Sequence, residues 1–289
     1  MTKVKMPLAN VETSETSSES ASVSFKTNLE KYTARHNRQG KSYSFPHIIA
    51  SPLRYEANYE YPLIVWLHDL GKTEKEIFEV VPKISVRNYV AVAPRGIATN
   101  VKRVARSRIN GRLVCEKRWN ERVYDWSETE ENVSEAENLV FDSISIAQEK
   151  YNVNPRRIFL VGHGNGGTMA LRIALRNPRE FTGVVSIDGA FPTLEHLPFR
   201  AWREARELPI LMTAGGSSSA HAPTITPENL RLFHTAGMTV TIRQYRETAS
   251  LKKNVAEVRM QNILRDVNTW MMDRALNPQA PLCEYFKNY

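Results

Sequence analysis

Six short apolar runs separated by helical patterns constrain the fold of this chain more than any other feature. Each run is four or five residues long, and they lie at 63–67, 89–93, 158–161, 184–187, 210–213 and 239–242. Between the runs, apolar side chains recur at helical spacing, most regularly across 132–150 and again near the end of the chain. Strands that alternate with helices predict an α/β fold: a doubly wound, mostly parallel sheet with helices on both faces.

One large domain is expected for most of the 289 residues, because a hydrophobic content of 42% is sufficient for a sizeable core. The beginning of the chain differs. Residues 11–24 consist mainly of Ser, Thr and Glu, which bury too little apolar surface to offset the entropy of ordering. The sequence therefore predicts a disordered Ser/Thr/Glu-rich tail at 1–30 and a single domain at 31–289, with a basic insertion at about 97–125.

The net charge of +8 is concentrated in this insertion, where residues 102–122 carry eight Lys or Arg against two Glu. Such a cluster is either a solvated surface segment or a positive rim that concentrates anionic ligands. No signature of a nucleic-acid-binding fold occurs, and Trp119 alone is a poor stacking platform. Nucleic acid is therefore not expected as a partner.

The sequence predicts neither a secretory signal nor a membrane span. Lys3 and Lys5 are not followed by the apolar stretch of a signal peptide, and no later run approaches the roughly 20 residues that cross a bilayer. The two cysteines, Cys115 and Cys283, lie far apart in sequence and are expected to be reduced. The expectation is a cytoplasmic protein without membrane contact.

Function is expected where the parallel strands end, because open α/β sheets bind ligands at the carboxyl ends of their strands. The sequence GHGNGG at 162–167 follows an apolar run and precedes a helical pattern. Its glycines, with Asp188 after the next run, fit a dinucleotide-binding fingerprint. That fingerprint usually opens its domain, whereas two candidate strands and a long helix precede it here. A dinucleotide-binding oxidoreductase domain is therefore the weaker interpretation.

The same turn fits a nucleophile elbow, in which G-x-S-x-G places a serine on a sharp turn between strand and helix. Gly162, Asn165 and Gly166 fit the frame, with Gly164 in the place of the nucleophile. At this point the chain resembles the α/β-hydrolases, and among them the small esterases of the phospholipase/carboxylesterase type. The resemblance covers roughly residues 43–273. It rests on five segments in order: PLIVWLHDLG at 62–71, VAVAPRG at 90–96, RRIFLVGHGNGGTMAL at 156–171, NPREFTGVVSIDGAFP at 177–192 and LPILMTAG at 208–215.

The resemblance implies a catalytic triad that this sequence does not retain. The family's catalysis needs a nucleophile, a histidine and a carboxylate. Gly164 has no side chain, Ser218 or Ser219 stands where the acid is expected, and no histidine follows His234, although the family's histidine follows the last strand. Because losing the serine or histidine of a triad costs on the order of a million-fold in turnover, hydrolysis by the usual mechanism is not expected.

The groups that remain could still bind a ligand. The resemblance implies an oxyanion hole formed by the N–H of Asn165 and one from the turn of Asp69 and Leu70. The N-terminus of the helix that begins near 165 also favours an anion. A small anionic or ester-like ligand is therefore expected, without a cofactor, and a protein partner stays open. The pocket candidates are His68, His163, Gly164, Asp188 and His221.

Two interpretations of the function follow. The first is a non-catalytic binding or regulatory pseudohydrolase. The alternative is an atypical hydrolase of carboxylic esters with relocated catalytic groups, in which His163 acts as base and Asp69 or Asp188 as nucleophile or acid. A metal site from His68, Asp69, His163, Asp188 and His221 would use reasonable ligand types, but no close ligand spacing supports it, so no metal is predicted.

Overall fold

The computed structural model of this chain describes residues 29–32, 35–36, 42–43, 45–109, 112–192, 203–214, 225–245 and 254–276. Most of the predicted tail at 1–30 lies outside the described residues, as do Ser218, Ser219 and His221. Within the described part of the chain, no helix combines the length and the apolar character that crossing a membrane requires.

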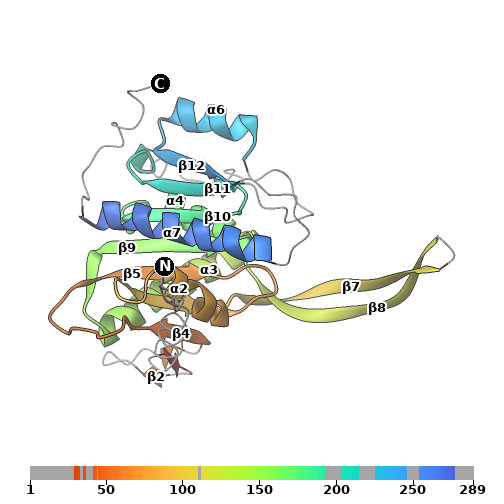
Figure 1. Cartoon of the computed structure of the whole chain (residues 1–289), viewed down its shortest axis with the longest axis horizontal. Helices are drawn as coiled ribbons and strands as arrows, with labels where there is room; N and C mark the ends of the chain where they lie inside the picture. Colours follow the sequence, from red (N-terminus) through yellow and green to blue (C-terminus); the bar gives the residue numbers. More distant parts are fainter. Residues whose placement is uncertain are drawn as a thin grey trace, which may run out of the picture.

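An eight-stranded sheet forms the centre of the protein, in the order β1-β4-β6-β5-β9-β10-β11-β12 (Figure 1). The parallel strands are β5 (Tyr61–Leu67), β6 (Val90–Pro94), β9 (Val153–His163), β10 (Gly183–Ile187), β11 (Ile210–Ala214) and β12 (Val240–Gln244). Strand β4 (His47–Ala50) pairs antiparallel with β6, and β1 (Leu29–Tyr32) pairs antiparallel with β4. Two short strands, β2 (Arg35–His36) and β3 (Ser42–Tyr43), form a separate pair. The predicted, mostly parallel α/β sheet is confirmed.

Helices cover both faces of the sheet, as predicted. One face packs against α3 (Glu130–Lys150), α4 (Asn165–Arg176) and α6 (Pro227–Ala236), and the other against α2 (Ile77–Ile84) and α7 (Asn254–Leu276). A short 3-10 helix, η1 (Glu74–Glu76), precedes α2. In β5, Leu63 and Val65 belong to the first core and Ile64 and Trp66 to the second. This double burial explains why the strands read as continuous apolar runs.

The segment between β6 and α3 forms a long two-stranded ribbon outside the main sheet. Strands β7 (Ile97–Ile109) and β8 (Arg112–Asp125) pair antiparallel, with a register shift between Ala105 and Arg106. The ribbon extends away from the rest of the described protein (Figure 1). It occupies the position of the basic insertion at about 97–125, for which the sequence analysis predicted no secondary structure.

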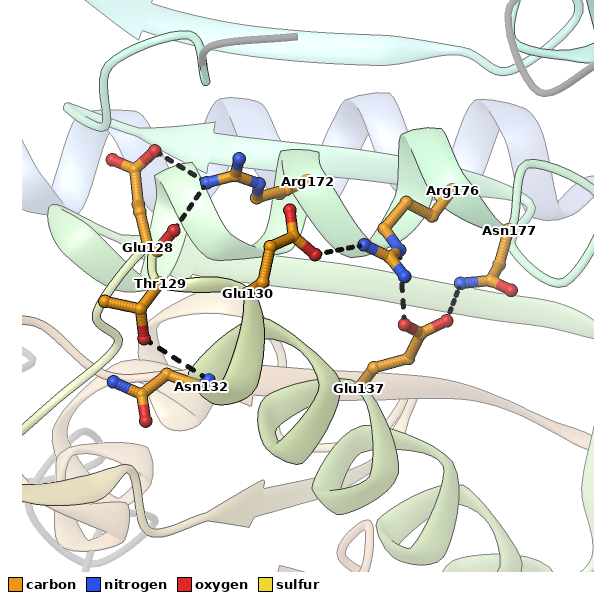
Figure 2. Close-up of polar contacts among 8 residues, drawn as sticks. All are labelled: Glu128, Thr129, Glu130, Asn132, Glu137, Arg172, Arg176 and Asn177. Atoms are coloured by element: carbon orange, nitrogen blue, oxygen red, sulfur yellow. Dashed lines mark hydrogen bonds and ion pairs between the residues drawn. The ribbon is translucent and has the colours of Figure 1, made fainter. Parts of the chain in front are cut away.

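Polar contacts fix α4 against α3 (Figure 2). The Arg172 guanidinium donates to the Glu128 carbonyl at 3.1 Å and to its carboxylate at 3.0 Å. One turn further, Arg176 lies 3.3 Å from the carboxylate of Glu130 and 3.4 Å from that of Glu137. These contacts hold the helix that begins immediately after residue 164.

Candidate functional site

A single residue separates β9 from α4, and it has the backbone conformation of a tight elbow. Gly164 lies at φ 53° and ψ −122°, a region that strains residues with a side chain. Strand, turn and helix also approach one another closely. A Cβ atom on Gly162 would overlap the backbone of Gly166, and one on Gly166 would overlap the carbonyl groups that end β5. The glycine spacing of the turn is thus explained by close backbone packing.

The carboxylate of Asp69 fills the space in front of Gly164. A Cβ atom built on Gly164 would overlap the Oδ1 atom of Asp69 and lie 3.0 Å from its Oδ2 atom. Asp69 comes two residues after the end of β5, the strand that pairs with β9. A side chain on residue 164 would therefore compete for its space with a carboxylate from the loop that follows the neighbouring strand.

Both N–H groups assigned by resemblance to the oxyanion hole donate to Asp69 Oδ1. The distances are 2.7 Å from Leu70 N and 3.2 Å from Asn165 N. In the hydrolases that the sequence resembles, two converging backbone donors stabilise the oxyanion of the tetrahedral intermediate. Here the two donors already hold an oxygen of the chain itself, so an external anion must displace Asp69 to reach them.

His68 is fully buried and has both ring nitrogens occupied. Its Nε2 accepts a hydrogen bond from Gly96 N at 2.9 Å, so the proton of the neutral ring lies on Nδ1, which donates to the Asp69 carbonyl oxygen at 2.8 Å. Burial lowers the pKa of His68 despite this carbonyl contact and nearby carboxylates. The imidazole therefore supports the loop after β5.

His163, the residue before Gly164, is paired with Glu76 of η1. Its Nδ1 lies 3.4 Å from Glu76 Oε1, and the other carboxylate oxygen accepts from Trp66 Nε1 at 3.1 Å. Burial opposes the charged imidazolium, but the hydrogen bond to Glu76 and its negative charge outweigh burial and raise the pKa of His163. A general base must be unprotonated, so this environment disfavours that role.

Asp188 follows β10 and is bound by Arg259, which lies on α7. The two guanidinium nitrogens donate to the two carboxylate oxygens at 2.7 and 2.8 Å, and the Asp188 side chain is only 8% exposed. The backbone N–H of Asp188 donates to Thr213 Oγ1 at 3.1 Å. The carboxylate that a dinucleotide-binding site would offer to a ribose is thus engaged by Arg259. Sequence reasoning did not identify this arginine.

The base of the ribbon contacts the same site. Asn165 Nδ2 donates to Asp125 Oδ1 at 2.9 Å, and Gly71 N donates to the Tyr124 carbonyl at 3.0 Å. Asp125 is the last residue of β8, and its contact was not predicted from the sequence. The side chain of Asn165, like its backbone N–H, therefore has an acceptor within the protein.

The structure brings Asp69, Leu70, Gly164 and Asn165 together, with His163 beside them, while His68 lies beneath the loop. Ser218 and Ser219, at the position expected for the acid, and His221 lie outside the described residues. Among the side chains that the structure does describe, no three His, Cys, Asp or Glu form a group that could hold a metal ion.

Comparison with known proteins identifies one family. The sequence pattern of the phospholipase/carboxylesterase family matches residues 54–271. No curated protein sequence matches the chain.

Solved structures show the same fold. An S-formylglutathione hydrolase from Agrobacterium tumefaciens is similar with a TM-score of 0.56 and 15% identity, over 85% of this chain and 95% of that chain. SOBER1 of Arabidopsis thaliana is similar with a TM-score of 0.53 and 19% identity, over 74% of this chain and 99% of that chain. A carboxylesterase of Bacillus cereus is similar with a TM-score of 0.51 and 15% identity, over 79% of this chain and 94% of that chain.

Proposed function

The chain belongs to the phospholipase/carboxylesterase family of α/β-hydrolases, and from this premise we propose that it is a non-catalytic member with a binding or regulatory role. One observation carries the proposal: Asp69 Oδ1 lies both where a nucleophile would stand on residue 164 and where the two backbone donors converge. Dinucleotide-dependent oxidoreduction gains no support from the family or from the solved structures.

Asp69 opposes ester hydrolysis in two ways. A substrate carbonyl oxygen has to lie against Leu70 N and Asn165 N for polarisation, and Asp69 Oδ1 already holds that position. If the substrate entered beside it, the developing oxyanion would face a carboxylate, and like charges at this distance repel. The electrostatic contribution that normally lowers the barrier therefore has the opposite sign.

The position of Asp69 also supports the alternative, an atypical hydrolase in which this carboxylate attacks the ester. A base and an acid would then have to assist it. His163 is paired with Glu76, and Asp188 is held by both nitrogens of Arg259. Because the hydrogen bonds to Asp69 Oδ1 also reduce the nucleophilicity of this oxygen, we favour the non-catalytic proposal.

Hydrolysis of p-nitrophenyl acetate and butyrate distinguishes the non-catalytic proposal from the atypical hydrolase. Three proteins purified in the same way are compared: the parent, Asp69→Asn, and Asp273→Asn as a control at an exposed carboxylate of α7. The proposal requires equal rates in all three, at the level of a mock preparation. A parent rate at least about tenfold above that of Asp69→Asn, and matched by Asp273→Asn, overturns it in favour of a relocated nucleophile.

A further inference from the structure

The β7–β8 ribbon is a separate structural element with no covering layer in the described protein. Its two strands pack extensively only on each other, and no other described helix or strand packs closely along them. Its base is anchored through Asp125 and Tyr124. An isolated two-stranded ribbon is marginally stable in water, which makes an unpartnered one of this length a candidate binding element.

The register of the ribbon distributes its basic residues in a regular way. Each of the eight Lys and Arg of residues 102–122 stands directly opposite an uncharged residue. The pairs are Arg122 with Asn100, Lys102 with Asn120, Arg103 with Trp119, Arg118 with Val104, Lys117 with Ala105, Arg106 with Cys115, Arg108 with Leu113 and Arg112 with Ile109. The glutamates fall elsewhere: Glu121 pairs with Val101, and Glu116 lies at the register shift.

Like charges directly opposite each other destabilise a strand pair, and this register contains no such pair among its basic residues. It also places no acidic residue directly opposite any of the eight basic residues. Basic residues therefore come from both strands, at nearly every pair between Lys102 and Ile109. At about 3.3 Å per residue, the charged part is about 30 Å long. The result is a narrow rod of positive charge with short and nearly constant spacing.

We propose that this ribbon is a binding arm for the phosphate backbone of double-stranded DNA. The major groove of B-DNA admits a two-stranded β-ribbon, and about 30 Å is close to one turn of the duplex. Six of the eight basic residues are arginine, whose guanidinium binds phosphate through paired hydrogen bonds. A regularly charged polymer matches the regular spacing of the ribbon, whereas the deep and narrow major groove of A-form RNA excludes it.

This inference goes beyond the proposed function and does not depend on it, because the ribbon would bind DNA whether or not the elbow were catalytic. It differs from the sequence-based expectation about nucleic acid. That expectation rested on fold signatures and on Trp119, and neither reports how a basic segment is paired.

The test is fluorescence anisotropy of a labelled duplex of about 20 base pairs with the full chain, between about 50 and 200 mM salt. The ribbon variant is Arg106→Gln/Arg108→Gln/Arg118→Gln. Its matched control is Arg87→Gln/Arg156→Gln/Arg231→Gln, three arginines outside the ribbon. The ribbon variant is expected to lose about tenfold or more in affinity. Its salt dependence should fall by about 0.9 in slope for each phosphate contact removed, while the control stays within about threefold.

A second variant, Lys102→Gln/Arg122→Gln, changes only exposed residues near the base and keeps the test valid if the first variant loses its ribbon. Circular dichroism establishes folding for all proteins. No DNA binding by the parent at the lower salt concentration overturns the proposal, as does equal affinity of both ribbon variants and the control. Tighter binding of duplex RNA or of polyglutamate than of DNA also overturns it, in favour of another polyanionic partner.

Discussion

Asp69 Oδ1 occupies the position that the first side-chain atom of any residue other than glycine would take at position 164. The same oxygen accepts the N–H groups of Leu70 and Asn165, so the carboxylate is held in place from both sides of the turn. Gly164 and Asp69 therefore depend on each other, although they follow different strands.

Gly164→Ala is expected to lower the free energy of unfolding by about 3 kcal/mol, because the new methyl group overlaps Asp69 and the backbone has a positive φ. In an Asp69→Ala background the same change should cost at least about 1 kcal/mol less, since only the backbone strain remains. Urea denaturation of the four proteins measures this coupling.

Gly237→Ala is the control for backbone strain alone. Gly237 has φ 65°, and a Cβ atom there meets only Arg206 Cδ at 4.0 Å. Its cost is expected to be about 1 kcal/mol and independent of residue 69. Equal costs for Gly164→Ala with and without Asp69 would show that the carboxylate does not occupy the elbow.

Asp69→Gly is expected to free the two backbone donors for a small carboxylate. Formate should then shift the amide resonances of Leu70 and Asn165 in nitrogen-15 NMR spectra and saturate with a dissociation constant of about millimolar. The parent should show no such shifts, and chloride at equal ionic strength controls for salt. A parent that responds like the variant would mean that Asp69 leaves the donors readily.

Arg259→Met is expected to lower the free energy of unfolding by about 3 kcal/mol, because it leaves the nearly buried Asp188 carboxylate without its cation. Lys83→Met removes an ion pair to Glu257 whose side chains are 31% and 68% exposed, and it should change stability by no more than about 0.5 kcal/mol. Thermal and urea unfolding compare the two. Losses of similar size would indicate that the Asp188 pair lies in solvent.

The pKa values of the two site histidines are expected to be shifted in opposite directions, with that of His163 raised and that of His68 lowered. At pH 6.5, the ordinary histidine pKa, His163 should be mostly charged and His68 mostly neutral. Nitrogen-15 NMR of the imidazole rings measures the pKa of each histidine. In the neutral form of His68, the same spectra should show the proton on Nδ1. Protonation of His68 at a higher pH than His163 would contradict the structure.

The raised pKa of His163 links its pairing to stability. A pKa raised on folding means that the charged imidazolium contributes stability fully below the unfolded value of about 6.5, and that the contribution is lost as the pH rises through the folded pKa. The stability difference between the parent and His163→Gln should therefore shrink as the pH rises above about 6.5. A difference that grows with pH would exclude the pairing with Glu76.

The fold was predictable because its signal is local. The apolar runs at 63–67 and 158–161 are buried on both sides, and double burial leaves a continuous pattern in the sequence. The ribbon was missed for a related reason: β7 and β8 pair with each other outside the main sheet, and their sequences carry a cluster of charge in place of a continuous apolar run.

The site was only partly predictable, because its decisive contacts join distant segments. The sequence shows that residue 164 has no side chain, and the family resemblance implies that Leu70 and Asn165 supply backbone donors. That Asp69 turns its carboxylate onto those donors depends on the packing of β5 beside β9. Arg259 lies on the last helix, and no spacing rule connects it to Asp188.

The overlap between Asp69 and position 164 also limits how this chain can change over generations. Serine at 164 meets the same obstruction as alanine, so a hydroxyl there fits only when the Asp69 side chain is displaced or replaced. Under the proposed function, a change at residue 69 alone brings no hydrolysis on which selection could act. A gain of ester chemistry at this turn would then need coupled changes at both positions.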